Sequence, residues 1–181
     1  LGDVYKRQTR KGSIKVDLSF VYKCTKEILK YSKRKKIIVT KSTVPVGTGD
    51  EIEKILKRKK KLFTVISNPE FLREGEAIRD FRYPDRIVIG SNEKKAFNIM
   101  KKLYAPLTNK GSKFFTTSRR GAELIKYASN AFLATKITFI NELANLCEKS
   151  GVNIEDISLG MGSDSRIGGR FLRAGPAYGG S

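Results

Sequence analysis

The sequence predicts an α/β protein with a mostly parallel sheet, continued by one long helix and an all-α segment. Up to Ser118, short β-branched or aromatic runs alternate with amphipathic helical stretches, which is the pattern of βαβ units. A helical pattern then runs without a break over 120–149, and glycine becomes frequent from Gly160 onward. These changes in pattern predict that one kind of architecture gives way to another near residue 118.

The expected elements follow one another in regular order. Apolar residues at helical spacing predict a first helix over 16–31, with Asp17 as its N-cap. The run 36–40 predicts a buried strand, and the helix after it is expected to begin with Thr48 or Asp50 as its cap. The other expected strands are 62–66, 86–90 and 113–117, and the other expected helices are 71–79, 93–104, 120–149 and 153–161.

Two prolines and one glycine set expected boundaries. Pro69 argues against a strand that continues beyond 62–66, and Pro106 predicts the end of the helix before it. Gly151 is expected to stop the long helix. That helix would be about 45 Å long, which suits a spine that joins two lobes.

The composition excludes several classes of function. The chain has no histidine, so it holds neither a Ser-His-Asp nor a Cys-His catalytic set, nor a metal site of the usual histidine-containing types. Cys24 and Cys147 are far apart and form no CxxC pattern, so no metal site or disulfide framework is expected. Neither a signal peptide nor an apolar run of about 20 residues is present, which predicts a cytoplasmic protein without a membrane partner.

The charge is strongly positive, with 37 Lys and Arg residues against 18 Asp and Glu residues and a net charge of +19. Such a chain attracts polyanions, and nucleic acid is the first candidate from charge alone. The densest runs, 33–36 and 57–61, fall where a helix is expected to end and a strand to begin. Positive charge suits a helix C-terminus, so nucleic-acid binding is the weaker interpretation.

Five segments, taken together in their order and spacing, resemble one known family. They are KSTVPVGT (41–48), NPEFLREGEAIRDF (68–81), PDRIVIG (84–90), AELIKYASNAFLATKITFINELA (122–144) and GMGSDSRIGGRFLRAGPAYGGS (160–181). Over about residues 12–181 the chain is similar to the UDP-glucose 6-dehydrogenases, within the wider family of nucleotide-sugar dehydrogenases.

The resemblance implies a fold and an activity. Residues 11–118 would form the second half of a Rossmann-like NAD-binding domain, 119–181 the long helix and the start of a central helical domain, and 1–10 a leader of foreign origin. The family oxidises the C6 alcohol of UDP-glucose to UDP-glucuronate in two steps. Two NAD are reduced, and a cysteine forms a thiohemiacetal and then a thioester. Homodimers or higher homo-oligomers would form through the central helices.

The resemblance also implies that the chain is a fragment. The glycine-rich pyrophosphate loop of the family, GxGxxG, is not found in the sequence. The nucleophilic cysteine of the family would follow Ser181 directly, and an aspartate of the family would come shortly after that cysteine. We therefore expect no turnover by the chain alone, and an open sheet edge with exposed apolar faces.

The first candidate site residues follow the strand 36–40, in a connector where parallel sheets place their ligand crevice. A hydroxyl there, such as that of Thr43, can hold the nicotinamide or its ribose, although a plain turn before Pro45 explains it equally well. The resemblance places Ser42, Thr43 and Val44 at NAD, and it also gives Thr43 a catalytic role.

The second group follows the next strand. Glu70 and Glu74 would share a helical face, and a carboxylate beside a thioester can orient or deprotonate the attacking water. Two surface carboxylates near a helix N-terminus are the alternative. The resemblance gives the water-orienting role to Glu70, places Glu74 against NAD, and adds Phe71, Leu72 and Arg73 to the substrate site.

Lys126 and Asn130 form the third group, on the long helix. Spaced four apart, they present an ammonium and an amide on one face, and such donors can stabilise a developing oxyanion. A single helical lysine is more often solvated. Within AELIKYASN, the resemblance assigns both residues to the covalent intermediates and to the sugar.

The glycine-rich end of the chain is the last candidate. Arginine grips phosphate with two donors, and the resemblance implies that this segment binds UDP, with Arg166 reaching the substrate of the neighbouring subunit. Loop packing is the alternative for its two aromatic residues. Sister enzymes use GDP-mannose or UDP-N-acetylmannosamine, but the RIG and FLRAG patterns favour UDP-glucose. The implied substrate-binding residues are Arg166, Phe171, Leu172, Arg173, Tyr178 and Gly179.

Overall fold

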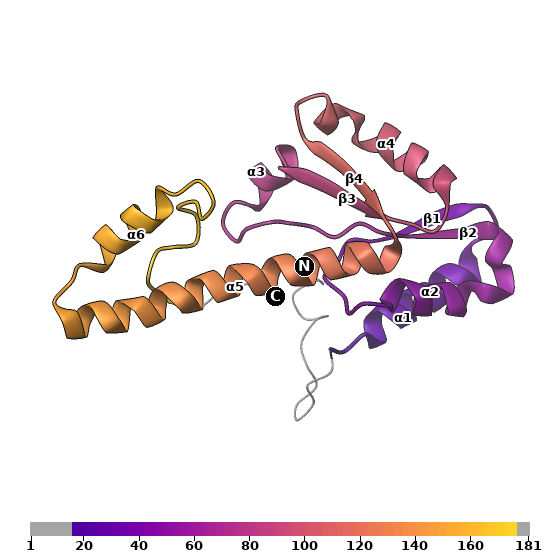
Figure 1. The fold of residues 1–181 in the computed structure, drawn as a ribbon. Coiled ribbons are helices and arrows are strands. Elements are labelled where there is room, and N and C mark those ends of the chain that lie inside the picture. The colour runs from indigo at the N-terminus through magenta and orange to yellow at the C-terminus, as the bar shows by residue number, and fades with distance from the viewer. Residues whose placement is uncertain (1–15, 177–181) are drawn as a thin grey trace. The chain divides into compact units, whose positions relative to one another are not determined.

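The computed structural model describes residues 16–176 of the 181-residue chain, and it divides into two compact units between Lys126 and Tyr127. The first unit is α/β and the second is helical, so the expected fold class is confirmed (Figure 1). In chain order the elements are α1 (Ser19–Tyr31), β1 (Lys36–Thr40), α2 (Thr48–Leu56), the 3₁₀ helix η2 (Lys57–Leu62), β2 (Phe63–Ser67), α3 (Ala77–Arg82), β3 (Arg86–Gly90), α4 (Lys94–Thr108), β4 (Lys113–Thr117), α5 (Arg119–Ser150) and α6 (Ile154–Gly162).

The described strands form one sheet in the order β1-β2-β3-β4. β1 and β2 pair in parallel over their whole length, and so do β3 and β4. β2 and β3 meet only at their carboxyl ends, through the antiparallel pair Ser67 and Gly90. The expectation of a mostly parallel sheet is therefore confirmed. Its two parallel pairs are joined at the centre only where the ends of β2 and β3 meet.

Pro69 explains this junction, because proline has no N–H to donate to a sheet ladder. The chain leaves β2 and continues along β3 as an extended segment. The Asn68 side chain takes over one ladder contact by donating to the carbonyl of Val88 at 3.0 Å. Further along, the Arg86 guanidinium lies 4.1 Å from the Phe71 ring centre.

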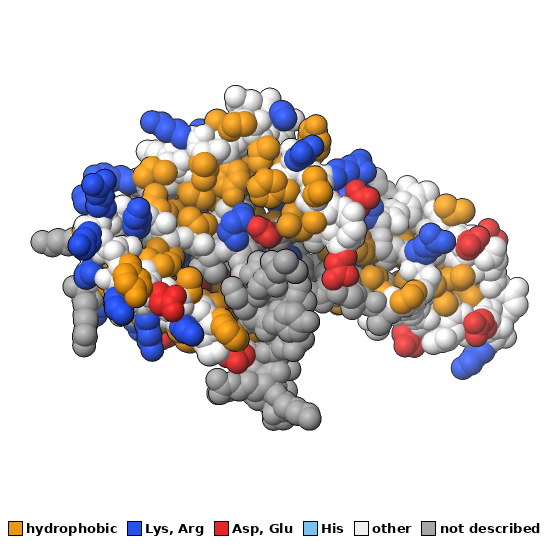
Figure 2. Space-filling view, turned by 180° about the vertical axis from the view of Figure 1, so that it is seen from behind, with side chains coloured by type: hydrophobic (Ala, Val, Ile, Leu, Met, Phe, Trp, Pro, Cys, Tyr) orange, Lys and Arg blue, Asp and Glu red, His pale blue; other side chains and the backbone are white. Residues whose placement is uncertain are grey.

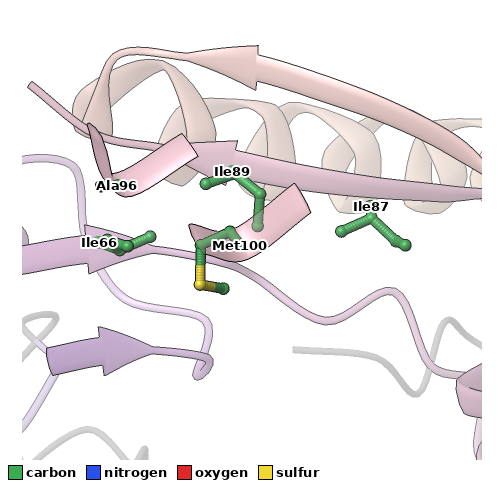
Figure 3. Close-up of a cluster of buried hydrophobic side chains, with 5 residues drawn as sticks. All are labelled: Ile66, Ile87, Ile89, Ala96 and Met100. Carbon is green, nitrogen blue, oxygen red and sulfur yellow. The ribbon is translucent and has the colours of Figure 1, made fainter. Parts of the chain in front are cut away.

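Alternation along the strands gives the sheet two buried faces, as in a layered α/β fold. One face packs against α1 and α2 around Ile52, Leu56, Phe63 and Val65. The opposite face packs against α4, where Ile66, Ile87, Ile89, Ala96 and Met100 form a buried cluster (Figure 3). The neighbours Val65 and Ile66 thus face opposite layers.

Several boundaries differ from those expected. The helix expected over 71–79 is wrong for its first half, because 71–76 runs beside β3 and turns before α3 begins at Ala77. The expected end before Pro106 is also wrong. α4 continues to Thr108, and because Pro106 lies in the last turn it removes only one helical hydrogen bond. At α1, Leu18 occupies the N-cap position, while Asp17 accepts from the Ser19 N–H at 2.9 Å.

The second unit contains α5 from Tyr127 onward, α6 and the chain after it. α5 ends as expected at Gly151, which adopts a φ of 69°. Asn153 caps α6 by accepting from the Glu155 N–H at 3.0 Å. None of the described helices has the length and apolar character needed to cross a membrane.

Gly90 marks the closest approach of α5 to the sheet. A Cβ at Gly90 would lie 2.6 Å from the Cβ of Ala122, 2.7 Å from the carbonyl oxygen of Ser118 and 2.9 Å from the Cα of Arg119. Two of these three atoms belong to the backbone, so they cannot move aside by changing a rotamer. The first turn of α5 therefore requires glycine at the end of β3.

We predict that Gly90→Ala lowers the free energy of unfolding by about 1–3 kcal/mol, because overpacking must displace backbone. Gly160→Ala in α6 is the matched control, since nothing lies within 4 Å of its added Cβ and alanine favours a helix. Chemical denaturation followed by circular dichroism measures both. Equal stability of the Gly90 and Gly160 variants would contradict the close packing of α5 on β3.

Candidate functional site

The two segments that follow β1 and β2 lie side by side at one edge of the sheet. Parallel strands bring their carboxyl ends to the same edge, and backbone pairing continues past both strands. The Asn68 N–H donates to the Thr40 carbonyl at 2.8 Å, and the Glu70 N–H donates to the Lys41 carbonyl at 3.2 Å. The connector 42–47 and the segment 68–71 are thereby held next to each other.

Lys41 joins these segments through its side chain. Its ammonium lies 3.4 Å from Glu70 Oε1 and donates to Asn68 Oδ1 at 3.3 Å and to the Tyr104 hydroxyl at 3.2 Å. The Tyr104 hydroxyl also donates to Asn68 Oδ1, at 2.5 Å. The buried Asn68 amide thus fixes the lysine, and the lysine in turn holds the Glu70 carboxylate at the surface.

Lys126 reaches the same segment from α5. Its Nζ lies 5.3 Å from the centre of the Phe71 ring, which also receives the Arg86 guanidinium at 4.1 Å. Attraction between a cation and an aromatic face stabilises such contacts. Glu70, Phe71 and Lys126, which the sequence assigned to one site, therefore come together in the first unit.

The connector after β1 is largely buried. Thr43 is 8% exposed and Val44 4% exposed, and Ser42 is half-buried. The hydroxyls of Ser42 and Thr43 thus lie at the carboxyl edge of β1, as expected. This donor set suits an amide or a ribose hydroxyl, so these residues fit the nicotinamide half of NAD.

Residues 71–76, which follow Glu70, do not form the helix that the sequence predicted. Glu70 and Glu74 do not share a helical face, because 71–76 is not helical. Leu72, Arg73 and Glu74 are exposed, and Glu74 opens a turn in which Gly75 has a φ of 81°.

Arg73 is engaged locally. Its guanidinium binds the Asp80 carboxylate with Nε at 3.0 Å and NH2 at 2.5 Å, and its backbone N–H donates to the same group. The Arg73 side chain holds the pKa of Asp80 below its usual range. This clamp ties the turn to α3.

The second unit holds the remaining candidates. Asn130 lies one helical turn beyond Lys126 on α5 and is half-buried. Arg166 and Arg173 are exposed, and Arg166 pairs with Asp164 at 2.6 Å. Leu172 is 3% exposed, so it belongs to the packing of this unit. Tyr178 and Gly179 lie outside the described residues.

Two α5 residues fix the chain after Arg166. Lys136 donates to the carbonyls of Ile167 and Gly168, at 3.1 Å and 3.4 Å. The Asn141 side chain both accepts from the Gly175 N–H and donates to its carbonyl. Between these anchors, Phe171 adopts a φ of 64°, which is uncommon for a residue other than glycine.

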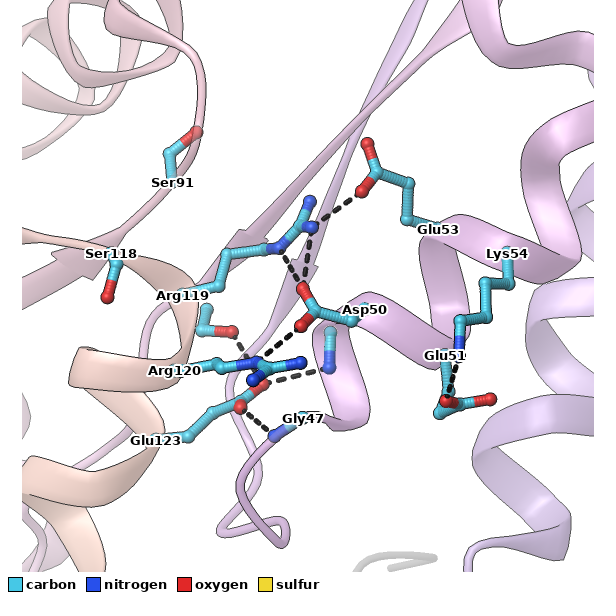
Figure 4. Close-up of polar contacts among 12 residues, drawn as sticks. Gly47, Asp50, Glu51, Glu53, Lys54, Ser91, Ser118, Arg119, Arg120 and Glu123 are labelled. Carbon is cyan, nitrogen blue, oxygen red and sulfur yellow. Dashed lines mark hydrogen bonds and ion pairs between the residues drawn. The ribbon is translucent and has the colours of Figure 1, made fainter.

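Sequence reasoning missed the polar contacts between α5 and α2 (Figure 4). Glu123 is 3% exposed and accepts from the N–H groups of Gly47 and Gly49, at 2.6 Å and 2.9 Å, and from the Ser67 hydroxyl at 3.0 Å. The expected caps Thr48 and Asp50 are wrong, because Gly47 is the N-cap and Glu123 binds the N–H groups there. No local pattern signals this cap, since its acceptor lies 76 residues away.

Arg119 provides a second link to α2. Its guanidinium, 4% exposed, binds Asp50 at 2.7 Å and Glu53 at 2.6 Å, while the exposed Arg120 binds the other oxygen of Asp50. Burial raises the pKa of Asp50, but the hydrogen bonds from Arg120 and Arg119 outweigh it, so the pKa lies below the ordinary value of 3.8.

The described residues contain no group of three or more Cys, Asp or Glu side chains that could hold a metal ion. On the face that Figure 2 shows, Lys and Arg side chains are most frequent toward the left end, with apolar and acidic side chains between them.

The sequence matches two family models, which together cover most of the chain. Residues 7–108 match the NAD binding domain of the UDP-glucose/GDP-mannose dehydrogenase family, and 120–181 match the central domain of that family. The chain therefore belongs to the UDP-glucose/GDP-mannose dehydrogenase family, a class of NAD-binding oxidoreductases.

Two of the curated relatives of this chain are UDP-glucose 6-dehydrogenases. The UDP-glucose 6-dehydrogenase of Rhizobium meliloti is 54% identical over 96% of this chain and 40% of its own length. That of Rickettsia prowazekii is 54% identical over 91% of this chain and 38% of its own length. The chain spans about two fifths of the curated relatives that it matches.

Solved structures of both a UDP-glucose and a GDP-mannose dehydrogenase resemble the chain. A UDP-glucose dehydrogenase from Pyrobaculum islandicum matches with a TM-score of 0.87 and 36% identity, over 97% of this chain and 41% of that one. A GDP-mannose dehydrogenase from Pseudomonas aeruginosa matches with a TM-score of 0.81 and 28% identity, over 97% of this chain and 42% of that one.

The Asp50 contacts predict a change in acid stability. Because the folded pKa is lower than the unfolded one, their contribution is complete above about pH 4 and is lost as the pH falls through the folded pKa. Asp50→Asn should therefore lower the thermal midpoint at neutral pH and flatten its decline below pH 4. Asp156→Asn, at an exposed acid of α6, is the control. An unchanged acid profile in the Asp50 variant would contradict this assignment.

Proposed function

We propose that this chain is the part of a UDP-glucose 6-dehydrogenase that aligns the nicotinamide end of NAD with the reacting carbon of the sugar. The observation that carries the proposal is the assembly of Glu70, Phe71 and Lys126 beside the connector of Thr43. Among the solved structures, the identity to a UDP-glucose dehydrogenase, 36% against 28% for the GDP-mannose enzyme, favours UDP-glucose as the substrate.

Each residue receives a role from its chemistry. Ser42, Thr43 and Val44 would hold the nicotinamide and its ribose, with Glu74 nearby. When bound, NAD would supply hydride acceptance, first from the C6 alcohol and then from the thiohemiacetal. The Lys126 ammonium, with the Asn130 amide one turn further on, donates to the oxyanion that develops at C6.

Glu70 would orient the water molecule that hydrolyses the thioester in the last step. Its carboxylate accepts a hydrogen bond from that water and turns its oxygen toward the acyl carbon. Lys41, 3.4 Å away, keeps Glu70 in one orientation. Thr43 contributes a further hydroxyl to the same edge.

The end of the chain would bind the nucleotide. The proposed UDP-binding residues are Arg166, Phe171, Leu172, Arg173, Tyr178 and Gly179. Lys136 and Asn141 hold the backbone of this part of the chain at Ile167, Gly168 and Gly175. A cytoplasmic location and a homodimer through the central helices stay predictions.

The substrate assignment is tested in a hybrid protein, in which residues 16–181 replace the aligned segment of the Rhizobium meliloti enzyme. We expect NADH formation with UDP-glucose to exceed that with GDP-mannose or UDP-N-acetylmannosamine by at least about tenfold, because an ill-fitting sugar loses at least one polar contact. A higher rate with either alternative sugar would assign the chain to a sister enzyme. No NADH with any of the three would overturn the proposed function.

Lys126→Ala in the same hybrid should lower kcat by about 10²–10³-fold, the usual cost of removing an oxyanion donor. Lys149→Ala, at an exposed lysine in the last turn of α5, is the matched control. Absorbance of NADH under saturating substrates measures both. Near-normal turnover of the Lys126 variant would contradict its role.

A further inference from the structure

Glu123 is a buried carboxylate that the mechanism above does not use. It stands on α5 and accepts hydrogen bonds from three places: the connector end at Gly47, the first turn of α2 at Gly49 and the last residue of β2, Ser67. All three contacts span more than fifty residues of sequence. Few side chains could fix the relative positions of three chain segments in this way.

The same carboxylate explains why glycine stands at the end of the connector, Gly47, and in the first turn of α2, Gly49. Gly47 adopts a φ of 97°, which aims its N–H at Glu123 Oε2 and which other residues rarely adopt. A Cβ at Gly49 would lie 3.0 Å from Glu123 Oε1 and 3.2 Å from the Ser67 hydroxyl oxygen. The sequence VGTG is thus shaped to admit a side chain from α5.

The carboxylate also occupies the position where a helix N-terminus attracts an anion. Because Glu123 fills this place at α2, the cofactor phosphates have no access to these two N–H groups. The connector can then contribute to cofactor binding only through groups other than these two N–H groups, such as the hydroxyls of Ser42 and Thr43.

The contacts of Glu123 reach each part of the proposed site. Lys126 follows it by three residues on α5, and residues at this spacing are neighbours on a helix surface. Gly47 ends the connector that carries Thr43, and Ser67 precedes the segment that carries Glu70. One side chain therefore sets the distances among the cofactor connector, the water-orienting carboxylate and the catalytic lysine.

We propose that Glu123 is a positioning residue that holds the cofactor connector in register with Lys126. The inference rests on the proposed function and extends it to a residue that touches neither cofactor nor substrate. Removal of the charge loosens the connector while UDP binding, which belongs to 160–181 in the other unit, is retained.

The first test is hydrogen–deuterium exchange on the 181-residue chain, which needs no activity. Glu123→Gln keeps the shape but places an amide NH₂ against N–H donors. We expect amide exchange at Gly47 and Gly49 to rise by about tenfold, the equivalent of one lost charge-assisted hydrogen bond, with β3 and β4 unchanged. Glu51→Gln, at an exposed carboxylate of α2, is the matched control. Unchanged exchange at both glycines would overturn the tether.

The second test uses the active hybrid protein. Glu123→Gln should raise the KM for NAD and lower kcat, each by about tenfold, while the Kd for UDP stays within about twofold. A merely structural role would lower the thermal midpoint and leave both kinetic constants of the folded enzyme unchanged, and that result would overturn the proposal.

A second variant, Gly49→Ala, tests the proposal even if Glu123→Gln does not fold. Gly49→Ala keeps the carboxylate but pushes on Oε1, so it should change KM for NAD and kcat in the same direction. Normal kinetics in both variants would overturn the proposal. An inactive unsubstituted hybrid would instead count against the proposed function, and the exchange experiment would still decide whether Glu123 tethers the connector.

Discussion

The contact between the first turn of α5 and the carboxyl edge of the sheet is the constraint on which the rest of the site depends. Gly90 lets the backbone of α5 approach β3, Arg119 binds α2 from one side, and Glu123 binds the start of α2 and the end of β2. Lys126 lies one turn further on and meets Phe71. Without this contact, the residues that follow β1 and β2 would have no fixed relation to those on the helix.

The junction between β2 and β3 has a direct consequence for the site. In a sheet that continued through Pro69, the side chains of 68–71 would alternate between two buried faces. Here the segment runs beside β3 at the sheet edge, so Asn68 is buried with hydrogen bonds at both its amide nitrogen and its amide oxygen, while Glu70 stays accessible. Because the sheet pairing ends at Pro69, the Glu70 carboxylate is accessible, while the backbone that carries it is hydrogen-bonded to Lys41.

Much of the fold could be predicted from sequence, and the failures have physical reasons. The strands 36–40, 86–90 and 113–117 are confirmed to the residue, because each is a short apolar or β-branched run bounded by polar residues. The helix expected over 71–79 fails in its first half because Phe71 is held against Arg86 of β3, and tertiary contacts override local propensity.

The site was predicted less completely than the fold. Motif resemblance led to Glu70, Phe71 and Lys126, which the structure brings together. Lys41 and Glu123 were missed because their partners lie 27 and more than fifty residues away, and a charged residue in isolation looks like any solvated one. The glycines of VGTG leave room for the Glu123 carboxylate, but nothing in the local sequence indicates which side chain fills that room.

The most direct measurement is a crystal structure of the hybrid enzyme with NAD and UDP-glucose bound. We predict that Lys126 Nζ lies within hydrogen-bond distance of the C6 oxygen, that Thr43 contacts the nicotinamide ribose or amide, and that Glu123 keeps its three contacts. A sugar bound away from Lys126, or cofactor phosphates at the N-terminus of α2 in place of Glu123, would contradict it.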